Sequence, residues 1–235
     1  GGHGLGISLT DNSVGNATQT LVVAGNSVAL AISDGIAISD VLAGAGAVNR
    51  DLAVYGNGVR TVGANAIELL DVVTGVDSAT LGTRMGRNSV TTAGSYGIRL
   101  AETVVSVPGA VVSDLAVYGN AVSIAGSAGI LAAFVGATVG SVSQTARLDG
   151  NEVATVGGNG ILFQDTLASV AGGVVQGLSI YGNQVGVATS NGISAAIVDA
   201  QVGGGVSQSM AVSANQVATV GLAGIAFSDA LFTVG

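Results

Sequence analysis

The chain has 235 residues, of which 39 are Gly, 49% are hydrophobic and only 9% are charged, so its composition departs from that of an ordinary globular domain. The net charge of -8, with six Arg and no Lys, argues against a nucleic-acid-binding surface, because phosphate binding draws its affinity from clustered cations. Cys is absent, which excludes disulfides and thiolate metal sites, and no apolar stretch reaches the roughly 20 residues that a transmembrane helix needs.

A repeat of 31 or 32 residues runs along the chain. Ile7 belongs to its first period, and from there an Asn marks each period. A Val stands two residues after each Asn, and an Ile stands ten residues after it. Gly precedes that Ile in six of the seven periods, with Ala66 as the departure. The seven marker residues are Asn26, Asn57, Asn88, Asn120, Asn151, Asn183 and Asn215.

Within each period, apolar residues alternate over short runs, as at Leu115 and Val117 and again at Val122 and Ile124. This alternation is typical of strands that bury one face, and the density of Gly and Val disfavours helix. We therefore predict two or three short strands per period, stacked period upon period into parallel sheets. The expected fold is an all-β parallel β-helix, or β-solenoid, of about seven coils with 31 or 32 residues per coil, forming a single domain over residues 1–235.

The seven marker Asn residues fit a tight turn between two strands. Asn tolerates a positive φ, and its side-chain amide can hydrogen-bond the equivalent amide one coil away. We predict that they form a structural ladder inside the solenoid.

The pattern N-x-V followed by G-I, as in Asn120-Ala121-Val122 and Gly129-Ile130, resembles the repeat of right-handed parallel β-helix proteins with the pectin-lyase-like scaffold. The resemblance implies the scaffold alone, since that group includes polysaccharide lyases, hydrolases and epimerases as well as phage tailspikes and bacterial surface adhesins. Coils of that group are usually shorter. We expect the additional residues to form an extended loop or an extra short strand after the Gly-Ile strand, for example over residues 170–175.

A second periodicity spans two coils. The segment 51–57 recurs at 114–120 and, loosened, at 177–183, and it carries an outward-pointing Tyr each time at steps of about 9.6 Å. This row is a copied surface feature, a lateral protein contact or a platform for sugar rings. The three residues are Tyr55, Tyr118 and Tyr181. The intervening coils carry Gln seven residues before the Asn, at Gln19, Gln144 and Gln208, with Leu81 as the exception.

Acidic residues recur fourteen residues after the Asn, and Phe134 and Ile197 interrupt the series. Three interpretations are open. The residues are turn-capping carboxylates, or they are calcium ligands, for which Asp40, Asp71 and Glu102 are the candidates, or they are the acid and base of a glycosidase-like cleft. No His, Lys or Arg series accompanies them, so we predict no enzyme, and no cofactor other than Ca²⁺. The full series is Asp40, Asp71, Glu102, Asp165 and Asp229.

The repeat continues to both ends of the sequence without a polar cap, so we expect a section of a longer solenoid or a filament subunit. Its charge-poor surface favours self-association. The expected function is an extracellular or cell-surface structural solenoid that assembles end to end into filaments or forms an adhesin shaft, with lateral bundling as a second contact. The alternative is a carbohydrate-binding or polysaccharide-cleaving β-helix protein.

Overall fold

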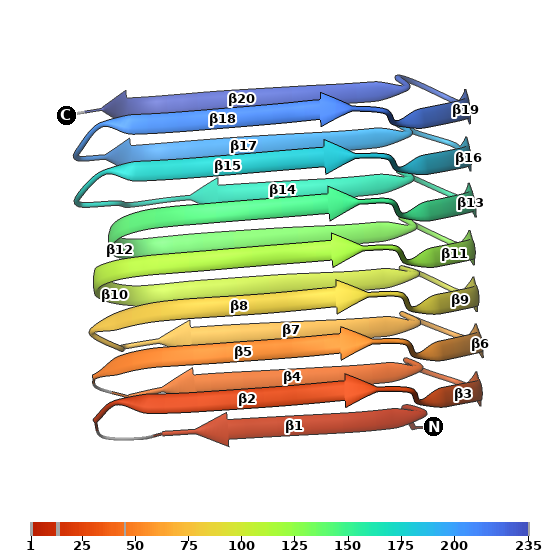
Figure 1. The fold of residues 1–235 in the computed structure, drawn as a ribbon, viewed down its shortest axis with the longest axis horizontal. Helices are drawn as coiled ribbons and strands as arrows, with labels where there is room; N and C mark the ends of the chain where they lie inside the picture. The colour runs from red at the N-terminus through yellow and green to blue at the C-terminus, as the bar shows by residue number, and fades with distance from the viewer. Residues whose placement is uncertain (1, 13–14, 45, 235) are drawn as a thin grey trace.

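The computed structural model describes residues 2–12, 15–44 and 46–234. Parallel strands stack coil upon coil along one axis, and the predicted β-solenoid of about seven coils is confirmed (Figure 1). All strand pairs in the described part of the chain are parallel, as expected when each coil lies on the equivalent strands of the previous one.

Each coil contains three strands. The first strand begins at the Gly-Ile motif in most coils, and the first strands are β1 (Leu5–Asp11), β4 (Ile36–Ala43), β7 (Ile67–Thr74), β14 (Ile161–Leu167), β17 (Ile193–Val202) and β20 (Ile225–Val234). The second strands are β2 (Ala17–Ala24), β5 (Ala47–Tyr55), β8 (Ser78–Gly86), β15 (Val174–Tyr181) and β18 (Val206–Ser213). In the two central coils β10 (Ile98–Tyr118) and β12 (Ile130–Asp149) supply both the first and the second strand without a break.

The third strands are short, and each follows a marker Asn. They are β3 (Ser27–Ala31), β6 (Gly58–Val62), β9 (Ser89–Ala93), β11 (Ala121–Ala125), β13 (Glu152–Val156), β16 (Gln184–Ala188) and β19 (Gln216–Val220). They form a seven-stranded sheet of their own, while the first and second strands belong to one 13-stranded sheet.

The spacing of the sequence repeat is the register of the sheets, except that Leu5 pairs with Ile36, so the assignment of Ile7 to that column is wrong. Ile67 pairs with Ile36 on one side and with Ile98 on the other, and Val59 pairs in the same way with Val28 and Val90. A register shift between Val107 and Ala110 takes up the extra residue of one 32-residue period. Equivalent side chains therefore lie in columns along the axis.

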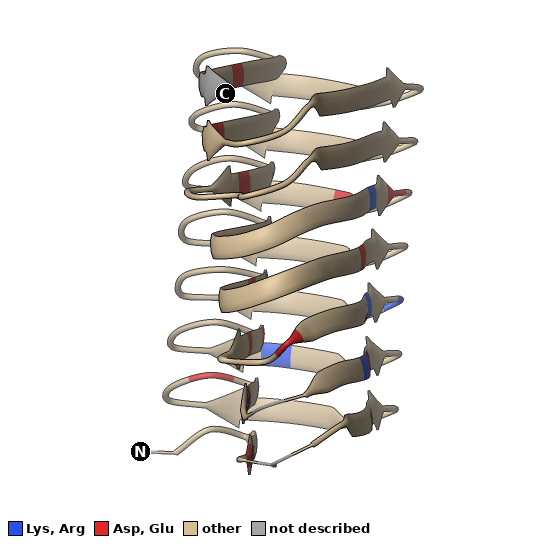
Figure 2. Cartoon of the chain, turned by 90° about the vertical axis from the view of Figure 1, so that its left-hand side faces the viewer, with Lys and Arg blue, Asp and Glu red and all other residues tan. Residues whose placement is uncertain are grey.

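The first and second strands form two layers that face each other across the core, and the short strands close one end of each flattened coil (Figures 1 and 2). Inward side chains form two hydrophobic clusters. One lies beside the short strands and includes Leu52, Val59 and Ile67, and the other lies toward the opposite end and includes Leu42 and Val111. Polar side chains occupy the interior between the two clusters.

Two backbone positions explain the glycines of the repeat. A side chain at Gly129 would collide with the Val153 side chain and with the carbonyl oxygen of Gly160, so the Gly-Ile motif of one coil fits against the N-x-V motif of the next. The residue before each marker Asn has a positive φ, from 55° to 67°, and is Gly in five coils, Arg87 in one and Ala214 in another. The expectation that the Asn itself adopts the positive φ is therefore wrong, because the preceding residue makes the turn.

The residues by which these coils exceed the usual coil length of the pectin-lyase-like group mainly lengthen the first and second strands. In β10 and β12 they continue the strand, so the predicted loop or extra strand is wrong for these coils. The connection over residues 168–173 keeps only an isolated bridge at Val170, which pairs with Val139 and Val202.

Candidate functional site

The seven marker Asn residues lie in one ladder at the turn between the second and third strands. The Oδ1 atom of Asn120 accepts hydrogen bonds from the backbone N–H and from the Nδ2 of Asn88, both at 3.0 Å. The Nδ2 of Asn120 donates to Asn151 Oδ1 and to the carbonyl oxygen of Met85, both at 2.9 Å. The arrangement repeats from Asn26 to Asn215. Each buried amide is thus hydrogen-bonded, and the ladder links successive coils.

The acidic series lies inside the core, except for Asp229, which is exposed on the last coil. Asp40, Asp71 and Glu102 occupy register-paired positions on β4, β7 and β10, and each is at most 1% exposed. Arg50 enters from β5 in the opposite layer, where its Nη1 lies 3.4 Å from Asp40 Oδ2 and its Nη2 pairs with Asp71. The turn-capping interpretation is therefore wrong for these three residues, because they stand in mid-strand and point inward.

Three buried carboxyl groups surround a single guanidinium. Burial lowers the pKa of Arg50, and the nearby charges of Asp40 and Glu102 oppose that shift. Burial raises the pKa of Glu102, although Ser113 and Thr83 donate hydrogen bonds to its two oxygens at 2.8 and 3.1 Å. This cluster holds charge within the core and presents no acid to solvent.

A second polar cluster lies nearer the C-terminus. Gln176 Nε2 on β15 donates to Asp165 Oδ2 at 2.8 Å and to Asp199 Oδ1 at 3.2 Å. Gln208 Nε2 on β18 donates to Gln176 Oε1 and to Asp199 Oδ2 at 2.9 and 3.0 Å. Burial, together with the charge of Asp199, raises the pKa of Asp165 to about 8, so this carboxyl is mostly protonated at pH 7.

The sequence pattern revealed only part of this polar interior. The position seven residues before the Asn carries Gln19, Gln144 and Gln208, but the same column also contains Arg50 and Gln176, and it faces the acidic column across the core. The signal in the sequence that could have shown that the acidic side chains point inward is strand alternation. Asp40 has the same parity as its inward neighbours Ile38 and Leu42, which already indicates an inward side chain.

The proposed calcium ligands Asp40, Asp71 and Glu102 are engaged by Arg50, Thr83 and Ser113. In the described residues, no group of three or more His, Cys, Asp or Glu side chains is arranged to hold a metal ion. Calcium binding at these residues stays a prediction.

The three Tyr residues lie on the outward side of the second strands. Tyr55 is 44% exposed and Tyr181 is 56% exposed, whereas Tyr118 is half-buried. The Tyr118 ring lies over Gly86 of the preceding coil, where an added side chain would collide with it. One face of that ring is thus packed on backbone. The row offers aromatic surface at every second coil.

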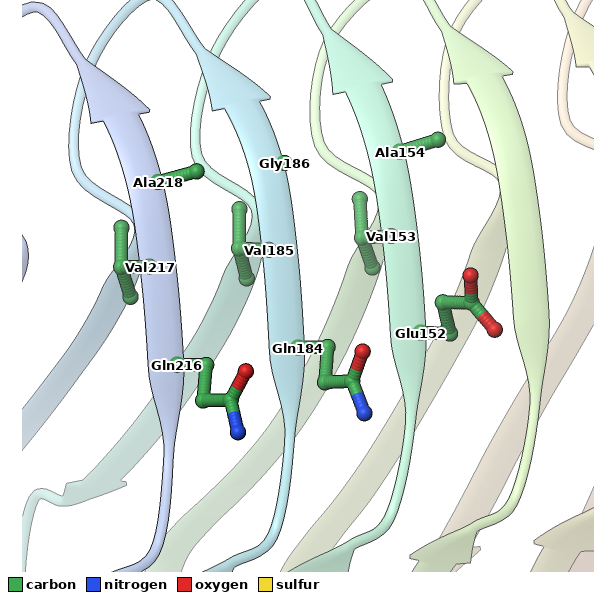
Figure 3. Close-up of a pocket in the computed structure, with 9 residues that line it drawn as sticks. All are labelled: Glu152, Val153, Ala154, Gln184, Val185, Gly186, Gln216, Val217 and Ala218. Carbon is green, nitrogen blue, oxygen red and sulfur yellow. The ribbon is translucent and has the colours of Figure 1, made fainter.

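A hollow open to solvent lies over the short strands β13, β16 and β19 (Figure 3). Glu152, Gln184 and Gln216 occupy equivalent positions on these strands and project in the same direction. The small residues Ala154 and Gly186 beside them leave the hollow unfilled. This row of hydrogen-bonding groups is exposed and lies at the spacing of adjacent strands, about 4.8 Å.

Comparisons with protein-family models, with curated proteins and with solved structures gave no match. In the part of the chain that the structure describes, no helix is long and apolar enough to span a membrane.

Proposed function

We propose that the chain is a structural β-solenoid, a shaft element of an extracellular or cell-surface assembly in which coils stack end to end. The observation that carries this proposal is the continuity of the coil. The strand register and the Asn ladder run through all seven coils, and the longest connection between described strands is the short segment 168–173.

The placement of ionisable groups supports a structural role over catalysis. Glu102 and Asp165 are 0% and 2% exposed, and both are hydrogen-bonded within the core. A polysaccharide-cleaving enzyme needs an accessible acid beside a cleft long enough for its substrate. The carboxyl groups of Asp40, Asp71 and Asp165 instead join the two layers through Arg50 and Gln176. Among the residues that line the hollow over the short strands, Glu152 is the one acid, without the second carboxyl group that glycoside hydrolysis uses.

End-to-end stacking is supported by the last coil. Phe227, Leu231 and Phe232 on β20 are 45 to 57% exposed, and β20 pairs with β17 on one side. A further coil would pair with this edge and cover these side chains, as each coil does for the one before it. That coil can come from the same polypeptide or from another molecule.

Negative-stain electron microscopy of the purified 235-residue chain at several concentrations, with and without Ca²⁺, tests this proposal. We expect rods of uniform width whose length increases with protein concentration. Rods of one short length at every concentration would contradict end-to-end assembly by this chain. A change in length with Ca²⁺ would support the calcium prediction for Asp40, Asp71 and Glu102.

Carbohydrate binding is the second candidate function, because Tyr55 and Tyr181 expose aromatic surface on the second strands. The two-coil step of about 9.6 Å suits a linear polysaccharide in which every second sugar presents the same face. Loss of oligosaccharide binding in Tyr181→Ala, measured by calorimetry, would favour it. Equal binding by the variant and the wild type would count against the row as the binding surface.

A further inference from the structure

The outward side of the first strands, here called the first-strand face, is broad and almost free of charge. Its central side chains are small or β-branched and include Val41, Val72, Ala101, Ala133 and Val135. Among the described residues of this face only Glu68 and Arg99 are charged, and they pair with each other. Each directly follows the Ile of the repeat, so the pair lies at the edge of the face where the first strands begin. The centre of the face therefore carries no charge, and the two charges at its edge neutralise each other.

The opposite side of the solenoid differs in charge. The outward side of the second strands carries five charged residues, and Arg84 Nη1 lies 2.7 Å from Asp51 Oδ1 in an exposed ion pair. The five are Asp51, Arg84, Asp114, Arg147 and Asp149. A charge-poor sheet surface of this extent is typical of a protein contact. Among the described residues the outward side of the short strands also carries only two charges, Arg60 and Glu152, but its strands are shorter.

The size of the first-strand face fits a stable dimer. Its eight strands extend about 34 Å along the axis at about 4.8 Å per strand, and its outward positions span about 20 Å along each strand. The resulting area of about 700 Å² per molecule is close to the roughly 800 Å² per partner of a standard interface.

The spacing of the rows indicates the partner. The strands keep the same direction from one end of the stack to the other, so side chains on this face form rows that repeat with every coil (Figure 1). Two such surfaces interdigitate over their whole length only if their rows have the same spacing. A second copy of this chain has that spacing, and it adds no uncompensated charge at the centre of the contact.

We propose that two copies of the chain pack first-strand face to first-strand face in a two-fold symmetric dimer. This lateral contact widens the rod, whereas end-to-end stacking lengthens it. The two assemblies use different surfaces, so either can fail without the other.

The test compares two Arg substitutions on the same strand, β12. Ala133→Arg places a charge at the centre of the first-strand face, where its register neighbours are Ala101 and Gln164. Thr145→Arg places the same charge on the opposite face, beside Asp114. Both positions point away from the core, so both variants should keep the wild-type circular dichroism spectrum and melting temperature.

At a protein concentration below that at which rods lengthen, light scattering after size exclusion should give twice the 22.4 kDa chain mass for the wild type and for Thr145→Arg, and a single chain mass for Ala133→Arg. Ala101→Arg provides a second disruption of the same face if Ala133→Arg misfolds. Rod width in negative stain should fall in the face variants while rod length is unchanged. A monomeric wild type, or a dimeric and folded Ala133→Arg, would overturn the proposal.

Discussion

Gln144 and Asp165 carry buried polar atoms that the interior leaves without a hydrogen-bond partner. Gln144 is paired in register with Gln176, but the residue at the acidic position of its own coil is Phe134. Within the described residues, neither polar atom of Gln144 has a hydrogen-bond partner, and Asp165 Oδ1 also lacks one. Each buried polar atom without a partner lowers the stability by about 1 to 3 kcal/mol. A charge on Asp165, whose Oδ1 has no partner, adds to this cost, so the stability depends on the protonation state of Asp165.

Asp165→Asn should reduce the dependence of stability on pH. Because the pKa of Asp165 is raised to about 8 in the folded protein, the folded state holds a proton that the unfolded chain has released above about pH 4. The free energy of unfolding should therefore fall as pH rises toward 8, by at most about 1.4 kcal/mol per pH unit from this group. Urea unfolding at pH 5 and pH 8.5 should show a shallower fall in the Asn variant.

Asp51→Asn is the matched control, since Asp51 lies in an exposed ion pair with Arg84. It should keep the wild-type slope of stability against pH. An Asp165→Asn variant with the wild-type slope would refute the assignment of the proton to Asp165.

At the scale of the strand, a close contact between the Gly-Ile motif and the Val of the next coil packs the short strands in most coils. Val122 on β11 is 2% exposed, and it packs where Gly97 of the preceding coil leaves room for it. Equivalent Val residues pair along the axis, as Val122 does with Val90 and Val153. The inward assignment of Val122, made from strand alternation, is confirmed, but that of Ile124 is wrong: Ile124 is 50% exposed, and Ala125 is the next buried residue of β11.

Val122→Asp should destabilise the protein by more than about 3 kcal/mol, because it places an unpaired charge in an apolar column. Ser123→Asp is the control, since Ser123 is exposed on the same strand and does not pair with Glu152. Its effect should stay within about 0.5 kcal/mol. Chemical denaturation at pH 7 measures both, and wild-type stability of Val122→Asp would refute the packing described for β11.

Over the whole molecule, each coil is hydrogen-bonded to the coils on either side of it, so stability is a sum over neighbouring coils. The central strands β9, β11 and β13 have partners on both sides. By contrast, β20 and β19 each have one partner in the described structure. Local opening should therefore be easier at the last coil than at the centre.

Hydrogen exchange followed by mass spectrometry should reveal this gradient in the 235-residue chain. Amides of β9, β11 and β13 should exchange most slowly, and those of the end strands with a single partner, such as β1, β3, β19 and β20, should exchange fastest. Equal protection of every strand would mean that the solenoid opens only as one cooperative unit, contrary to nearest-neighbour stabilisation. At high protein concentration, end-to-end stacking should slow exchange selectively in β20.

The sequence by itself determined the coil length, the strand register, the Asn column and the inward apolar columns of the first and second strands, because spacing and alternation are properties of the chain read along its length. Only the tertiary structure decided that Arg50 meets Asp40 and Asp71, and that Gln176 meets Asp165. These partners come from opposite layers, and their contact depends on how the two layers are placed across the core. The apolar first-strand face likewise emerged only when eight separate strands were set side by side.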